Sequence, residues 1–105
     1  MTDRIGAILA MLEKSPDDTF LYYSLGMEYA AAGRFDQAVE HLKKCIELDA
    51  DYLPAYVEAG KCLRSAGRLA EARQIFTQAM ELACRLGQGH TRDFIKQQFD
   101  GLPRA

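Results

Sequence analysis

Apolar residues recur every three or four positions along most of the chain, which is the spacing of one face of an α-helix. In one segment these positions are Leu21, Leu25 and Tyr29, and Gly33 follows them. A glycine just past a helix readily adopts the left-handed conformation that ends it, so Gly33 and Gly67 predict two helix ends. A second apolar series begins directly after each of these glycines. The pattern therefore predicts helical hairpins and an all-α fold.

The hairpin pattern occurs twice, with a period of 34 residues. When residues 19–52 are aligned with residues 53–86, eight positions are identical, whereas ordinary composition would give roughly two by chance. The identical pairs are Tyr22/Tyr56, Gly26/Gly60, Ala32/Ala66, Gly33/Gly67, Arg34/Arg68, Ala38/Ala72, Glu47/Glu81 and Leu48/Leu82. This agreement indicates two copies of one structural unit.

Gly26 and Gly60 lie inside the first helix of each unit. A glycine in a helix interior costs about 1 kcal/mol relative to alanine, so its occurrence in both units needs a structural reason. We expect the two helices of a hairpin to approach closely there, with Ala38 or Ala72 opposite the glycine. The tyrosine one turn earlier, Tyr22 in the first unit, is expected to fill the adjacent space.

These residues resemble the tetratricopeptide repeat, a 34-residue helical hairpin with the pattern W-x2-L-G-x2-Y…A-x3-F…P. The first unit matches at Tyr22, Leu25, Gly26, Tyr29, Ala38 and Leu42, and the second at Tyr56, Ala59, Gly60, Leu63, Ala72 and Phe76. Ala50 and Cys84 stand where the pattern has its closing proline. The resemblance implies an α-solenoid of stacked antiparallel hairpins.

The flanking segments extend this architecture to about six helices in a single domain, residues 1–105. Residues 2–15 are expected to form the second half of a preceding repeat. Residues 19–52 and 53–86 are the two full repeats, and residues 91–101 are expected to form a capping helix after a break at Gly87 and Gly89. Asp51 and Thr91 are the expected N-caps of the helices that follow them.

The bulk composition restricts the class of protein. The 105 residues are 49% hydrophobic and carry a net charge of −2 with interspersed signs, which is typical of a globular domain and gives no indication of nucleic-acid binding. We expect neither a signal peptide nor a membrane-spanning segment. Three widely spaced cysteines are expected to be reduced thiols in a cytoplasmic protein.

The residues that could support catalysis are scattered. Cys84 and His90 would form a cysteine–histidine pair only if the fold brought them into one pocket, and His41 is expected to face solvent. No spacing typical of a metal site or a phosphate-binding loop occurs. We therefore expect a protein that is not an enzyme and has no metal or cofactor.

The resemblance implies a binding function, because first helices of successive repeats line a concave groove in this family. The groove positions here are Phe20, Tyr23, Ser24, Met27, Val57, Glu58, Lys61 and Arg64. An apolar half beside two cations suits a peptide or helix with an apolar anchor and an acidic residue. One subgroup of the family grips a C-terminal carboxylate with Lys, Arg and Asn, but the matching positions carry Tyr23, Met27 and Glu58, so we do not expect that clamp.

Two other interpretations stay open at this point. The terminal helices could fold over Phe20, Tyr23 and Met27 and bury them. A second copy of the chain could also cover these residues, because two full repeats are few and a short stack gains stability by docking its open end. The sequence therefore predicts a protein- or peptide-binding adaptor, with structural self-association as the alternative.

Overall fold

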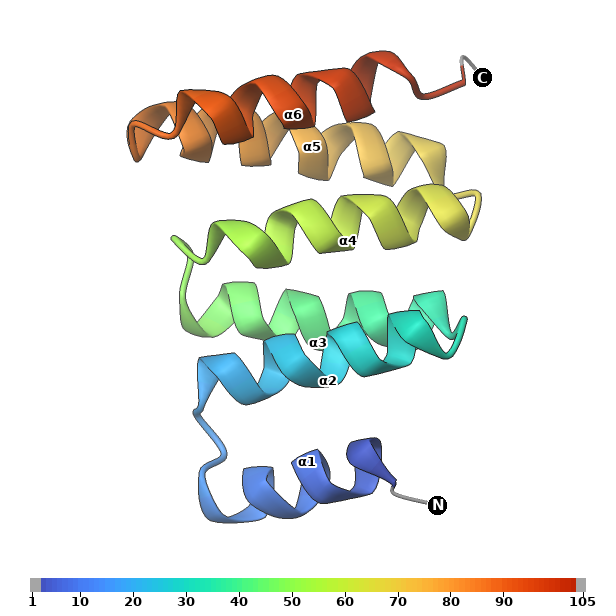
Figure 1. Ribbon diagram of the computed structural model, residues 1–105, viewed down its shortest axis with the longest axis vertical. Coiled ribbons are helices and arrows are strands. Elements are labelled where there is room, and N and C mark those ends of the chain that lie inside the picture. Colours follow the sequence, from blue (N-terminus) through green and yellow to red (C-terminus); the bar gives the residue numbers. More distant parts are fainter. Residues whose placement is uncertain (1–2, 104–105) are drawn as a thin grey trace.

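The computed structural model describes residues 3–103 as a stack of six α-helices (Figure 1). The helices are α1 (Arg4–Lys14), α2 (Thr19–Ala31), α3 (Phe35–Leu48), α4 (Leu53–Ser65), α5 (Leu69–Arg85) and α6 (Gly89–Asp100). No strand occurs within this described part of the chain, and the predicted all-α fold is confirmed. None of the six helices is both long and apolar enough to cross a bilayer.

The helices form two layers along the stack. α2, α4 and α6 lie in the front layer of Figure 1, and α3 and α5 lie behind them. α3 packs between α2 and α4, and α5 packs between α4 and α6, whereas α1 packs on α2 at the N-terminal end. The hairpins predicted from the two glycine breaks are therefore α2–α3 and α4–α5.

The same backbone turn connects three pairs of helices. Gly33, Gly67 and Gly87 have φ values of 76°, 76° and 71°, a left-handed conformation that glycine adopts without steric cost. The residue after each glycine donates its N–H to a carbonyl five residues earlier, and in the last turn Gln88 N lies 2.8 Å from Ala83 O. The α5–α6 connection is thus a hairpin turn of the same kind, and Gly89 begins the last helix.

Two predicted helix caps are wrong. α4 begins after Tyr52, which makes no side-chain capping bond, while Asp51 lies in the preceding turn and donates its N–H to Asp49 Oδ1 at 3.0 Å. α6 begins after Gln88, and Thr91 lies inside its first turn. The turn at Gly87 determines where α6 starts. Gln88, the residue after this glycine, donates its N–H to Ala83 O at the end of α5, and α6 begins at the next residue.

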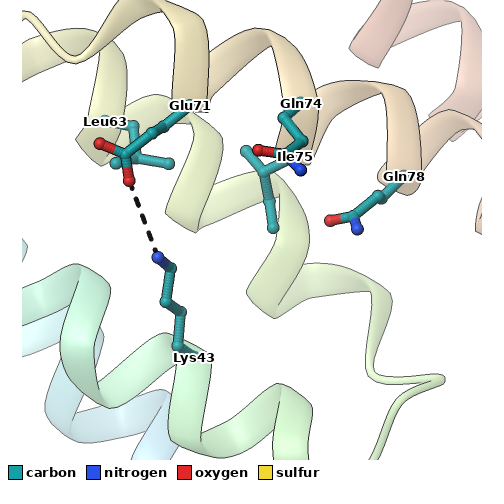
Figure 2. Close-up of a pocket in the computed structure, with 6 residues that line it drawn as sticks. All are labelled: Lys43, Leu63, Glu71, Gln74, Ile75 and Gln78. Atoms are coloured by element: carbon teal, nitrogen blue, oxygen red, sulfur yellow. Dashed lines mark ion pairs between the residues drawn. The ribbon is translucent and has the colours of Figure 1, made fainter.

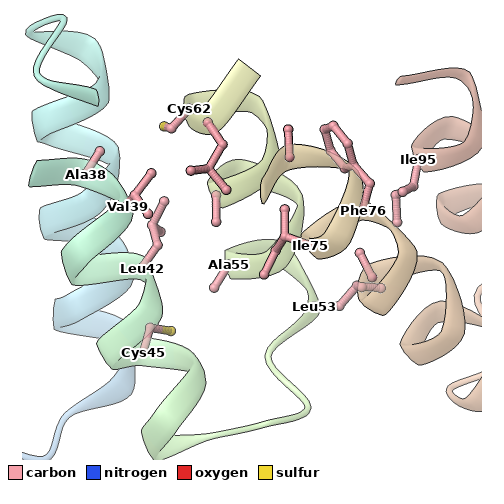
Figure 3. Close-up of a cluster of buried hydrophobic side chains, with 14 of the residues drawn as sticks. Ala38, Val39, Leu42, Cys45, Leu53, Ala55, Cys62, Ile75, Phe76 and Ile95 are labelled. Atoms are coloured by element: carbon pink, nitrogen blue, oxygen red, sulfur yellow. The ribbon is translucent and has the colours of Figure 1, made fainter. Parts of the chain in front are cut away.

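The interior confirms the predicted close approach of paired helices. A Cβ atom placed on Gly26 would lie 2.6 Å from Leu42 Cγ and 3.3 Å from the carbonyl oxygen of Ala38. The equivalent atom on Gly60 would meet the ring of Phe76. Leu42 and Phe76 are fully buried in the apolar cluster shown in Figure 3. The glycines therefore make room for Leu42 and Phe76, and not, as predicted, for Ala38 and Ala72; of these two, only the carbonyl oxygen of Ala38 is among the nearest atoms.

Candidate functional site

The eight residues predicted to line a groove lie on α2 and α4, which are neighbours in the front layer (Figure 1). We call this surface the α2–α4 face: Phe20, Tyr23, Ser24, Met27, Val57, Glu58, Lys61 and Arg64. Phe20 is 61% exposed, so α1 does not bury it. The other seven residues are half-buried. The face therefore has one prominent apolar side chain, and its remaining residues are partly accessible.

The aromatic part of the face is held in place by the next connection in the chain. The rings of Tyr23 and Tyr52 are tilted by 50°, with their centroids 5.3 Å apart. Burial raises the pKa of Tyr23, and the nearby carboxylate of Glu58 raises it further. The phenol therefore stays neutral near pH 7 and can donate a hydrogen bond.

The charged part of the face is partly compensated within the protein. Lys61 Nζ lies 3.3 Å from Glu58 Oε1, and the Lys61 side chain is 40% exposed. Arg64 Nη1 donates to Gln98 Oε1 at 2.5 Å. Gln98 is not among the predicted site residues, although it lies 34 residues after Arg64, which is one repeat period. α6 thus supplies a residue to the end of this face.

A cleft between α1 and α2 borders the α2–α4 face. It has a volume of about 310 Å³ and is lined by Arg4, Ala7, Ile8, Met11, Phe20, Leu21, Ser24 and Glu28. Arg4 Nη1 lies 3.3 Å from Glu28 Oε1. We call this feature the α1–α2 cleft. The sequence pattern did not predict this cleft, which shares Phe20 and Ser24 with the α2–α4 face.

A polar cleft lies on the back layer, between α3 and α5 (Figure 2). Its lining is Lys43, Leu63, Glu71, Gln74, Ile75 and Gln78, and its volume is about 190 Å³. Lys43 Nζ lies 3.8 Å from Glu71 Oε2. Glu71 also accepts two hydrogen bonds from the Arg68 guanidinium, which lower the pKa of Glu71. The Lys43–Glu71 pair joins α3 to α5, and Arg68, at the start of α5, also reaches Asp36 on α3 at 2.9 Å.

The structure places the residues considered for catalysis apart from the α2–α4 face. His41 does not face open solvent as expected: it is half-buried and stacks on the Tyr29 ring at a centroid distance of 5.1 Å. Burial lowers the pKa of His41. Cys84 is exposed near the end of α5, in a cleft that Arg92 and Lys96 also line, and His90 is exposed in the first turn of α6.

Comparison with known proteins gives a family match and whole-chain structural matches. The family model described as tetratricopeptide repeat matches residues 29–83. A TPR repeat-containing protein of Pseudomonas aeruginosa is 39% identical over 77 residues, which are 73% of each chain. A solution structure of a Bordetella parapertussis protein is 28% identical, with a TM-score of 0.86 over 97% of this chain and 89% of that one.

A further structural match was determined with a bound partner. The TPR2B domain of yeast Sti1, in a complex with pHsp70, is 21% identical, with a TM-score of 0.84. The match covers 90% of this chain and 76% of that chain. At this level of identity the match shows a shared fold.

Proposed function

Because the chain belongs to the tetratricopeptide repeat family, whose hairpin stacks are protein-interaction modules, we propose that its α2–α4 face binds a peptide or a helix. The ligand we propose has an apolar anchor and an acidic residue. The yeast domain with this fold, in its pHsp70 complex, supports a protein or peptide as the class of partner. In this proposal the protein acts by binding and performs no catalysis.

The observation that carries the proposal is an exposed aromatic ring near the start of α2 together with two cations in the second half of the neighbouring α4, which runs in the same direction. Phe20 is 61% exposed, and Met27 is partly exposed on the same helix. Burying an exposed aromatic side chain against an apolar anchor is favourable, and aromatic residues dominate the energetics of many protein interfaces. The α1–α2 cleft extends the apolar surface around Phe20.

The cations would recognise the acidic residue. Lys61 carries three donors and Arg64 carries five, and the contacts with Glu58 and Gln98 leave donors on both side chains for a ligand. A ligand carboxylate would compete with Glu58 for Lys61, so this contact contributes specificity more than affinity. In the proposal, most of the affinity comes from burying Phe20 against the apolar anchor of the ligand.

The test is selection of binders from a displayed random peptide library, followed by calorimetry. We expect the selected peptides to combine an apolar and an acidic residue. Replacing both cations, Lys61→Glu with Arg64→Glu, should weaken their binding about tenfold or more. The matched control, Arg34→Glu with Lys44→Glu, replaces two exposed cations away from the α2–α4 face, makes the same change in net charge and should leave binding unchanged.

The outcomes separate the proposal from simple electrostatic attraction. Equal losses for both double variants would mean that net charge, not the α2–α4 face, determines binding. Full affinity in the Lys61/Arg64 variant would place the site elsewhere. Circular dichroism of all variants should show unchanged helicity, because these side chains lie outside the buried core.

A further inference from the structure

Helix α1 has a neighbour on one side only. The second helices of the two hairpins, α3 and α5, each lie between two first helices, whereas α1 packs on α2 alone at the end of the stack (Figure 1). Leu12 is buried against α2, while Leu9 and Met11 are 43% and 53% exposed. Because Leu9 and Met11 are two residues apart, they point to opposite sides of α1, at the two edges of a face that no described segment covers.

The opposite end of the stack is adapted to solvent by paired charges. On α6, Arg92 pairs with Asp93 at 2.8 Å, and Lys96 pairs with Asp100 at 2.8 Å. Among the residues that the structure describes, α1 makes no comparable ion pairs on its outer face, and Arg4 reaches back to Glu28 on α2. Phe94 on α6 is also 44% exposed, so apolar exposure alone does not distinguish the two ends; the outer face of α1 differs in having no ion pair among the described residues, and we therefore consider it the docking end.

The outer face of α1 is complementary to itself. Asp3, Ala7, Ala10 and Lys14 are all exposed, and their spacing of four, three and four residues places them along one line of the helix. The line begins with a negative charge and ends with a positive one. Met11 borders this line on the side of the α1–α2 cleft.

We propose that a second copy of this chain docks on the N-terminal end of the stack, with the two α1 helices antiparallel about a two-fold axis. In this arrangement Asp3 faces Lys14 of the second copy at both ends of the contact, and Ala7 faces Ala10 between them. A parallel arrangement would instead place like charges together. A two-fold contact of this kind uses the same surface on both copies and closes at a dimer.

The side chains of the contact are compatible with close packing. Alanine at the two central positions lets helix axes approach to the short end of the usual range of about 8–10 Å. The second copy would cover Met11, whose burial supplies apolar stabilisation, while the Asp3–Lys14 pairs set the direction of the helices. Because α1 has only 11 residues, we expect a weak dimer with a Kd on the order of 10–100 µM.

Sedimentation equilibrium from about 1 µM to 1 mM tests the dimer over the range where it should form. Wild-type protein should shift from one to two chains per particle. Ala10→Arg should raise the Kd at least tenfold, since it places a long charged side chain in the centre of the contact. The matched control is Ala70→Arg, at an exposed alanine of α5, which should dimerise normally.

A charge exchange tests the direction of the helices. Asp3→Lys and Lys14→Glu should each weaken self-association, because each places like charges at both ends of the contact. Mixing the two variants should restore dimers, since each mixed pair again has opposite charges at both ends. Lys61→Glu with Arg64→Glu should leave the dimer intact, so this test is independent of the peptide-binding proposal.

Asp3 also caps α1 by accepting from Gly6 N at 3.0 Å, so circular dichroism must accompany the Asp3→Lys variant. If that variant loses helix, the Ala10→Arg and Ala70→Arg pair decides the question. A monomer up to about 1 mM, an unchanged dimer in Ala10→Arg, or failure of two folded charge variants to associate on mixing would overturn the proposal. If the protein were monomeric, the outer face of α1 would be a candidate surface for binding a different protein.

Discussion

The hairpins α2–α3 and α4–α5 share one repeat pattern, yet they bury their first helices to different extents. α2 buries Leu25, Gly26 and Tyr29, whereas α4 buries twice as many residues: Leu53, Ala55, Ala59, Gly60, Cys62 and Leu63. α4 lies between α3 and α5, while the N-terminal neighbour of α2 is the shorter, less closely packed α1. The repeat pattern thus determines each hairpin, and the position in the stack determines how much of it is buried.

The contact at the helix crossing also differs between the hairpins. Gly26 faces Leu42, and Gly60 faces the larger Phe76. Both large side chains are fully buried. The second hairpin therefore fills its crossing with an aromatic ring and has less freedom to rearrange around an added side chain.

The largest effect is expected from filling these crossings. Gly60→Leu should unfold the protein at ordinary temperature, because a side chain there overlaps the Phe76 ring, which is enclosed on all sides. Gly26→Leu should cost about 3 kcal/mol or more, and Ala38→Phe on the facing helix should have a similar effect. Urea and thermal denaturation followed by circular dichroism measure these differences.

Gly89→Leu is the matched control, since no atom lies within 4 Å of a Cβ placed on Gly89. Its melting temperature should stay close to that of the parent. If Gly26→Leu and Gly60→Leu also kept the parental melting temperature, the proposed packing of both hairpins would be wrong.

Features that occur in both repeats could be predicted from the sequence. A glycine inside a helix is destabilising, so its occurrence at the same position of both repeats indicates a structural reason. Gly26 and Gly60 identified the helix crossings, and Gly33, Gly67 and Gly87 identified the turns. The prediction that Asp51 caps α4 was wrong. Asp51 belongs to the turn between α3 and α4, and this turn extends to Tyr52, which the preference of aspartate for N-cap positions does not reveal. Helix starts depend on connection geometry, which differs between a hairpin turn and the link between repeats.

The candidate surfaces were only partly predictable. The α2–α4 face follows from the family resemblance, and the residues on it remain a prediction. The α1–α2 cleft and the contact of Gln98 with Arg64 were missed, because both bring together segments far apart in the chain. The stacking itself creates these contacts, and a single hairpin pattern does not contain them.

A smaller loss of stability is expected from removing the hydroxyl group of the tyrosine near the start of each repeat, Tyr22 or Tyr56. Tyr56 Oη donates to Ala50 O at 2.7 Å, and Tyr22 Oη donates to Pro16 O at 3.0 Å. Each bond joins a first helix to the connection before it. Tyr56→Phe and Tyr22→Phe should each cost about 0.5–1 kcal/mol, with the larger loss at the shorter bond of the second hairpin.

Urea denaturation of the two phenylalanine variants measures this difference. Tyr52→Phe is the control, since its ring packs on Tyr23 and this contact survives loss of the hydroxyl. Its stability should change by less than about 0.5 kcal/mol. A loss at Tyr52 equal to that at Tyr56 would show that the hydroxyl contacts of the repeat tyrosines contribute nothing particular to the stack.

The effect that is smallest at neutral pH, where it vanishes, concerns the thiols buried in the two hairpins, Cys45 on α3 and Cys62 on α4. Burial raises the pKa of Cys45 from 9.0 to about 11, and it also raises the pKa of Cys62. The unfolded chain releases the thiol proton at a lower pH than the folded protein, so the thiol contribution to stability is complete below pH 9 and is lost as the pH rises toward 11.

Urea denaturation between pH 8 and 11 should show this decline in stability. Cys45→Ala should make the decline shallower, whereas replacing the exposed Cys84 with serine should leave its shape unchanged. If Cys45→Ala and Cys84→Ser changed the pH profile of stability equally, the alkaline decline would come from groups outside the helix crossings. The titration of the buried thiols would then say nothing about how tightly each hairpin is packed.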